Sequence, residues 1–151
     1  MELYKKAKAA KDVNEQALFG NVRMATATGR DYTGRLCRDP LRLETIDAQN
    51  ILTVEPNAEV FAMGTMITDY LLRSGRYVEA ETYAAKTAQL GNAMNTYMWD
   101  AKKGAYFDFD LVKMKRRDWY PHMGGAYAIN AGVHGNDLSK AYAQAGYIVD
   151  N

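Results

Sequence analysis

A long stretch of helical periodicity that breaks at one glycine, Gly75, constrains this chain more than any other feature. Asn57 to Ser74 and Arg76 to Trp99 carry apolar or small residues every three or four positions, and Gly75 stands between them. Glycine ends a helix there because it adopts the left-handed backbone of a C-terminal cap at little cost. With so short a connection, the two helices must fold back as an antiparallel hairpin over 57–99.

The remainder of the chain extends this helical pattern with one interruption. Residues 1–28 contain good helix formers with apolar positions near the helical period, and Asp137 caps a last helix over 137–149. Residues 30–56 are irregular and predict a long loop, while 105–111 alternate in the manner of a short strand. We therefore expect a single all-α domain over 1–151, built of helical hairpins with a short β-excursion.

Composition narrows the partners and the chemistry. Nineteen basic and eighteen acidic residues give a net charge of +1, which provides no attraction to nucleic acid. No window approaches the roughly 18 apolar residues of a membrane span, and Met1 to Asp12 lack the apolar core of a signal peptide, so a cytoplasmic location is the default expectation. The single Cys37 and the isolated His122 and His134 predict no metal site.

One segment stands out as a candidate for chemistry. Gly29-Arg30-Asp31-Tyr32-Thr33-Gly34-Arg35-Leu36 follows the first helical region and opens the long loop. Taken alone, Asp31 also fits a turn in which its carboxylate accepts backbone hydrogen bonds. Two further segments follow in a fixed order, Ile51 to Ala58 (ILTVEPNA) and Trp99 to Asp110 (WDAKKGAYFDFD).

Each of these three segments resembles, at the right spacing, a piece of the α,α-trehalases, inverting glycoside hydrolases built on an (α/α)6 toroid of paired helices. The first resembles the family motif Gly-Trp-Asp-Phe-Ser-Ser-Arg-Trp, whose aspartate is the general acid. The resemblance implies a partial (α/α) toroid that acts on trehalose without a metal or cofactor. It also implies Asp31 as the general acid, with Gly29 and Arg35 in substrate binding. Three positions depart from the motif: Arg30, Gly34 and Leu36.

The other two matching segments carry mainly structural expectations. Asn57 is a suitable N-cap for the first helix of the hairpin. Asp108 and Asp110 look like a carboxylate pair, but residues two apart on a strand point the same way and lie only about 7 Å apart. The resemblance implies that this acidic strand organises the toroid, so we expect both aspartates to be structural.

An inverting glycosidase needs a second carboxylate, roughly 6.5–9.5 Å from the first, to activate water. In the family this base is a glutamate near the C-terminal end of the enzyme, and its Gln-Trp-Asp-Xaa-Pro-Asn signature is not present in these 151 residues. We therefore expect an internal fragment with little turnover alone. A partial toroid also leaves apolar helix edges uncovered, which predicts self-association.

A different class of protein is the alternative interpretation. Residues 75–88 resemble half of a tetratricopeptide repeat, although no partner unit follows at the repeat spacing of about 34 residues. In this reading the chain is a non-catalytic interaction module. Its second hairpin helix would present four side chains to a partner: Tyr83, Leu90, Met94 and Tyr97.

Overall fold

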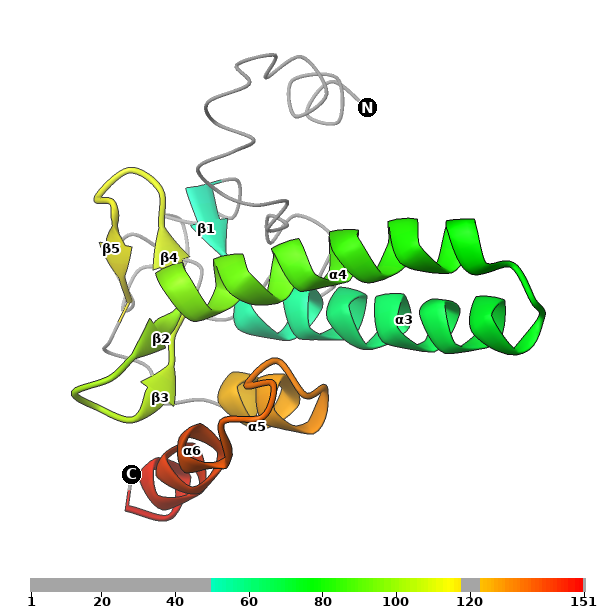
Figure 1. Ribbon diagram of the computed structural model, residues 1–151. Helices are drawn as coiled ribbons and strands as arrows, with labels where there is room; N and C mark the ends of the chain where they lie inside the picture. Colours follow the sequence, from blue (N-terminus) through cyan, green and yellow to red (C-terminus); the bar gives the residue numbers. More distant parts are fainter. Residues whose placement is uncertain (1–49, 118–122, 151) are drawn as a thin grey trace.

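The computed structural model describes residues 50–117 and 123–150 (Figure 1). Two long helices, α3 and α4, form the body of this part, and two shorter helices, α5 and α6, pack beside one end of it. This part also contains five two-residue strands. One precedes the hairpin in sequence, and four stand between the hairpin and the shorter helices. The predicted helices of 1–28 and residues 30–49 of the predicted loop lie outside the described residues.

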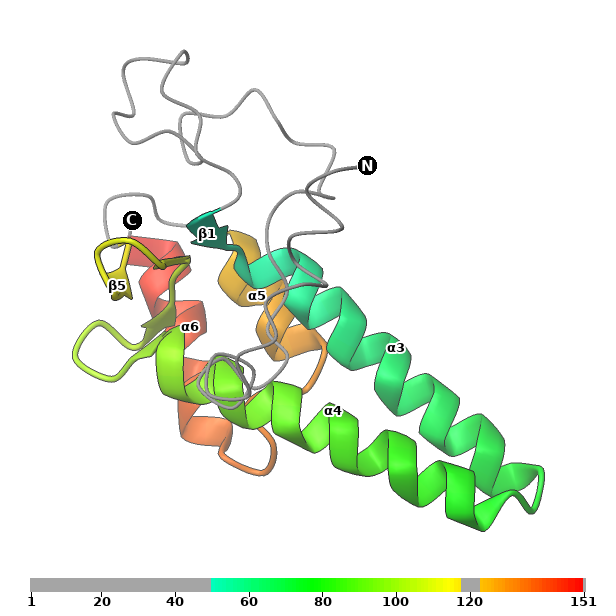
Figure 2. The ribbon, with the colours of Figure 1, turned by 90° about the horizontal axis from the view of Figure 1, so that it is seen from above.

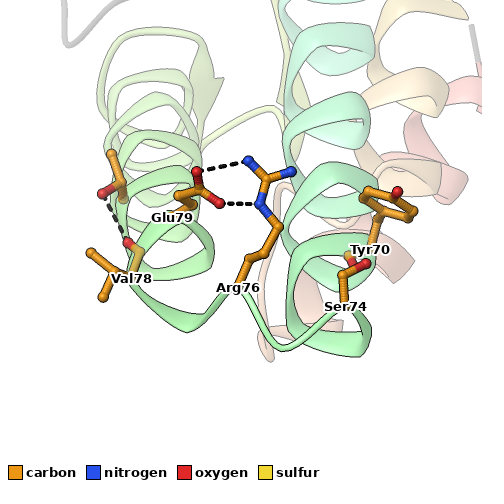
Figure 3. Close-up of polar contacts among 6 residues, drawn as sticks. Tyr70, Ser74, Arg76, Val78 and Glu79 are labelled. Atoms are coloured by element: carbon orange, nitrogen blue, oxygen red, sulfur yellow. Dashed lines mark hydrogen bonds and ion pairs between the residues drawn. The ribbon is translucent and has the colours of Figure 1, made fainter.

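The predicted hairpin is present as α3 (Val54–Arg73) and α4 (Tyr77–Tyr97), which run antiparallel side by side (Figures 1 and 2). Gly75 has a φ of +72° and sits in the turn, as its position in the sequence predicts. Arg76 donates two hydrogen bonds to Glu79 beside the turn (Figure 3). This hydrogen bonding lowers the pKa of the exposed Glu79 carboxyl.

Small residues let the two long helices approach closely. A Cβ added to Gly64 of α3 would lie 2.2 Å from Thr87 Oγ1 of α4, and one added to Gly91 would lie 2.7 Å from the Phe61 ring. Leu71 is buried at the distal part of this contact. At each of these two glycines the backbone of one helix therefore lies against a side chain of the other helix, which leaves no room for a larger residue.

The side chains of the alternative interaction surface face the wrong way for that role. Leu90 is 4% exposed and Met94 is fully buried, and both belong to the main core; Tyr97 packs against this core and edge-on against Phe109. Of the four side chains of this predicted surface, only Tyr83 is exposed, at 41%. The predicted partner-binding face is wrong because most of its apolar stripe is used to pack α4 against the rest of the chain.

Helix α3 begins three residues earlier than the sequence predicts. Thr53 is the N-cap residue, so Asn57 lies inside the first turns, where its side-chain amide donates to the Thr53 carbonyl at 2.6 Å. Proline is compatible with this start, because Pro56 falls among the first residues of the helix, whose N–H groups have no partner within the helix. The predicted extension of the loop to residue 56 and the predicted N-cap role of Asn57 are therefore wrong.

The alternating segment 105–111 is not one strand. Ala105–Tyr106 (β3) pairs antiparallel with Trp99–Asp100 (β2) in one small sheet. Phe109–Asp110 (β4) is the middle strand of a second sheet, between Ile51–Leu52 (β1) and Lys115–Arg116 (β5). The chain passes from one sheet to the other at 107–108, so the two halves of the alternating segment pair with different strands.

The C-terminal helices complete the described core. Helix α5 (Met123–Asn130) packs on α3, and α6 (Leu138–Asp150) packs on α5 and β3 (Figure 2). Asp137 accepts hydrogen bonds from the backbone and side chain of Ser139 at the start of α6, as expected of its cap. The main core collects apolar side chains from β1, α3, α4, β3, β4 and α5 and from the residues just after α4 and α5: Leu52, Val54, Ala58, Leu90, Met94, Met98, Tyr106, Phe109, Ala128 and Val133.

Candidate functional site

The three candidate site residues, Gly29, Asp31 and Arg35, lie outside the described residues. What the structure describes is the framework that receives the chain after this segment. It consists of β1, the first turn of α3 and the acidic segment around β4, which meet at one end of the hairpin (Figure 1). This framework fixes where the long loop ends.

The strand β1 is held in one register against β4. Ile51 pairs with Asp110 and Leu52 with Phe109, and the Leu111 N–H donates to the Asn50 carbonyl at 2.9 Å. Ile51 and Leu52 are 1% and 2% exposed, so both faces of this strand are covered. The last residues before α3 are thus fixed by both hydrogen bonding and burial.

Asp108 joins this strand pair to α3. Its Oδ1 accepts a hydrogen bond from the Val54 N–H at 3.0 Å, and its backbone carbonyl accepts one from the Arg117 N–H at 2.7 Å. The Asp108 side chain is 3% exposed. A buried carboxylate at the first N–H groups of a helix also interacts favourably with the helix dipole. Asp108 is therefore a cap supplied from another part of the chain.

The other two aspartates of the segment shape turns. Asp100 Oδ1 accepts from the Lys102 and Lys103 N–H groups at 2.9 and 3.1 Å. Asp110 Oδ1 accepts from the Val112 and Lys113 N–H groups at 3.0 and 2.9 Å. These contacts confirm the structural role expected for Asp108 and Asp110. Sequence spacing gave no means of finding the particular partner of Asp108, which lies 54 residues away.

Glu55 is a further buried acid beside this junction. It is 4% exposed in the first turn of α3, and a Cβ on Gly124 of α5 would lie 3.3 Å from its carboxyl carbon. Glycine at 124 thus permits α5 to approach this carboxyl group closely. The sequence marks neither this contact nor the burial.

A second polar cluster that sequence reasoning missed lies between α4, β3 and α6. Asn95 Oδ1 accepts from the Tyr106 hydroxyl at 2.8 Å and from Lys140 Nζ at 2.7 Å, and its amide donates to the Val133 carbonyl at 2.7 Å. Burial raises the pKa of the Tyr106 phenol, and the charge of Asp137 adds to this effect. Asn95 uses both ends of its amide, so the cluster ties three elements together.

The described residues supply neither a metal centre nor a membrane span. Within 50–117 and 123–150, no three histidine, cysteine, aspartate or glutamate side chains are grouped so that they could hold a metal ion. In the same ranges no helix is both long and apolar enough to cross a bilayer. The buried Asp108 and Asp110 act as acceptors for backbone N–H groups.

The hairpin and its capping strands place the described part among folds of paired helices. A solved structure with this arrangement is the neutral trehalase Nth1 from Saccharomyces cerevisiae, with a TM-score of 0.58 at 18% identity; the match covers 99% of this chain and 26% of that one. The trehalase family model matches residues 1–144. This chain belongs to the trehalase family.

Curated relatives agree with this assignment. The periplasmic trehalase of Citrobacter koseri is 29% identical over 101 residues, which are 67% of this chain and 18% of that enzyme. Human trehalase is 29% identical over 112 residues, or 72% of this chain and 19% of that enzyme. The periplasmic trehalase of Salmonella newport is 30% identical over 101 residues. The chain thus spans under a fifth of the length of these relatives.

Proposed function

We propose that these 151 residues carry the general-acid half of a trehalose-hydrolysing site, with Asp31 as the acid. The observation that supports this most is the family match over residues 1–144, because it includes the segment Gly29 to Leu36. The relatives that match are named trehalases. In this role Asp31 donates a proton to the glycosidic oxygen as the bond to the sugar breaks.

The neighbours of Asp31 have distinct roles in the proposal. Arg35 orients or contacts the sugar, and Gly29 lets the chain turn between the first helical region and the loop. Arg30 is a cation beside the acid, so it favours the ionised carboxylate and opposes proton storage near neutral pH. The junction of β1, Asp108 and α3 supports the proposal indirectly by fixing the far end of the same loop.

The proposal assigns an acid to this chain and no general base. General acid catalysis by itself contributes about 10²- to 10⁴-fold, and inversion also requires a second carboxylate that activates water. We therefore propose that the polypeptide alone releases little or no glucose from trehalose.

The test is glucose release from trehalose by the full chain and by its Asp31→Asn variant. We expect both proteins to release glucose no faster than buffer without protein. The general acid achieves little without a general base, so replacing it with a neutral amide should leave the rate unchanged. A substantial rate that the substitution abolishes would contradict the proposed half-site, since the chain would then contain a complete catalytic apparatus.

We also propose that the chain self-associates through an exposed helix face. The exposed side chains of α3 support this, because several of them are large and apolar. Such association is independent of trehalose chemistry.

A further inference from the structure

Helix α3 exposes a seam that the packing of the described residues leaves uncovered. Glu59, Met63, Met66, Tyr70 and Arg73 follow one another at spacings of four, three, four and three, the pattern of the contact positions of a coiled coil. We call these five residues the α3 seam. Its three central side chains are 59%, 71% and 65% exposed.

The seam is a different face from the one that builds the core. Towards α4, helix α3 presents Phe61 and Gly64, which meet Gly91 and Thr87. Towards α5 it presents Val54 and Glu55 at its first turn. In Figures 1 and 2 the hairpin turn projects away from the strands, α5 and α6, so none of these described elements covers the distal half of α3.

The charges at the two ends of the seam are complementary. Glu59 stands at one end and Arg73 at the other, with apolar side chains between them. Arg73 uses Nε for its ion pair with Asp69, at 2.8 Å, and its terminal guanidinium nitrogens are further donors. A second copy laid antiparallel would bring Glu59 against Arg73 of the partner subunit at both ends, whereas a parallel copy would place like charges together.

We propose that this chain forms a two-fold symmetric dimer in which the α3 seams of two copies pack antiparallel. The two-fold axis passes near Met66, so the two Met66 side chains meet at the centre. The net charge of +1 gives little repulsion between copies. This deepens the proposed self-association and does not depend on Asp31 or on trehalose.

The size of the seam sets the expected strength. A helix of 20 residues is about 30 Å long, and the α3 seam has far fewer residues than the roughly 20–30 that each side of a standard interface contributes. The dimer is therefore weak and concentration-dependent, with a dissociation constant in the micromolar range or above.

Sedimentation of the full chain over about 5–500 µM tests the surface, with variants Met66→Lys and Val149→Lys. Both positions are highly exposed, at 71% and 83%, and both changes add the same charge. We expect wild type and Val149→Lys to pass from monomer to dimer across this range, while Met66→Lys remains a monomer. A wild-type chain that stays monomeric or forms larger assemblies would overturn the proposal. So would a Met66→Lys variant that dimerises as well as the wild type.

A charge exchange tests the orientation. Glu59→Lys and Arg73→Glu should each weaken the dimer about threefold to tenfold, because each introduces like charges at both ends. The double variant should regain most of the wild-type affinity, since the pairs are then restored in reverse. A double variant as weak as the single variants would overturn the antiparallel arrangement. The trehalose assay is separate, so either proposal can fail without the other.

Discussion

Asp108 supplies the hydrogen bond at the start of α3 that the local N-cap residue does not. Within the described residues, Thr53 makes no capping hydrogen bond with its side chain, and the Val54 N–H donates to Asp108 instead. We expect Asp108→Ala to lower the free energy of unfolding by about 1–3 kcal/mol, because it leaves a buried N–H group without its acceptor. Urea denaturation of the full chain measures this.

Two further variants serve as controls for this prediction. Asp108→Asn keeps a side-chain oxygen that can accept from Val54, so it should cost less than the alanine. Asp100→Ala removes an aspartate that accepts hydrogen bonds from nearby backbone N–H groups in a half-exposed turn, where water can replace it. An alanine at 108 that costs no more than one at 100 would show that the long-range cap contributes little.

Tyr106 makes stability depend on pH at the alkaline end. Burial raises the pKa of this phenol in the folded chain, so between its ordinary value of about 10 and the folded value only the unfolded state releases the proton. The unfolded state then binds fewer protons, and stability falls as pH rises above about 10, by at most roughly 1.4 kcal/mol per pH unit. Tyr106→Phe should lose this part of the dependence, as measured by denaturant unfolding at pH 9 and pH 11; an unchanged pH dependence would contradict it.

At the scale of elements, the closeness of α3 and α4 depends on small residues at their contact. Alanine at Gly64 would gain up to about 1 kcal/mol of helix propensity but would place a methyl group against Thr87. We expect Gly64→Ala to destabilise the wild-type hairpin, because overpacking costs about 1–3 kcal/mol. In a Thr87→Ala background the same substitution should become neutral or stabilising, as thermal or urea unfolding would show.

Gly146 of α6 is the matched control for this change. A Cβ there would meet nothing within 4 Å, so Gly146→Ala should stabilise the chain by about 0.5–1 kcal/mol in either background. If Gly64→Ala behaved like Gly146→Ala in the wild type, the close contact between α3 and α4 would be wrong.

Elements with a long local signal could be predicted from the sequence, and those set by distant contacts could not. The hairpin followed from apolar spacing and Gly75, because both are local properties of the chain. The start of α3 did not, because Asp108 caps Val54 across the fold and Pro56 is tolerated in the first turns. The split between β3 and β4 depends on which strands they pair with, which alternation alone does not reveal.

At the scale of the whole molecule, the family was predictable because three ordered segments carry it. The burial of Glu55 and the linkage of Asn95 with Tyr106 and Lys140 were not, since a polar residue in a helical pattern gives no sign of its partner. The roles of Gly29, Asp31 and Arg35 remain predictions, because these residues lie outside the described ranges. The described framework nevertheless fixes the point at which their loop joins α3.

The central proposal is that Asp31 acts as a trehalase general acid. Its most direct test replaces the segment of yeast neutral trehalase Nth1 that matches this chain with the chain itself, and measures trehalose hydrolysis by the folded chimera with and without Asp31→Asn. Asp39→Asn serves as the control from the same loop. We expect an active chimera that loses about 10²- to 10⁴-fold in kcat with Asp31→Asn and little with Asp39→Asn. A folded chimera that is inactive, or that keeps its activity without Asp31, would contradict it.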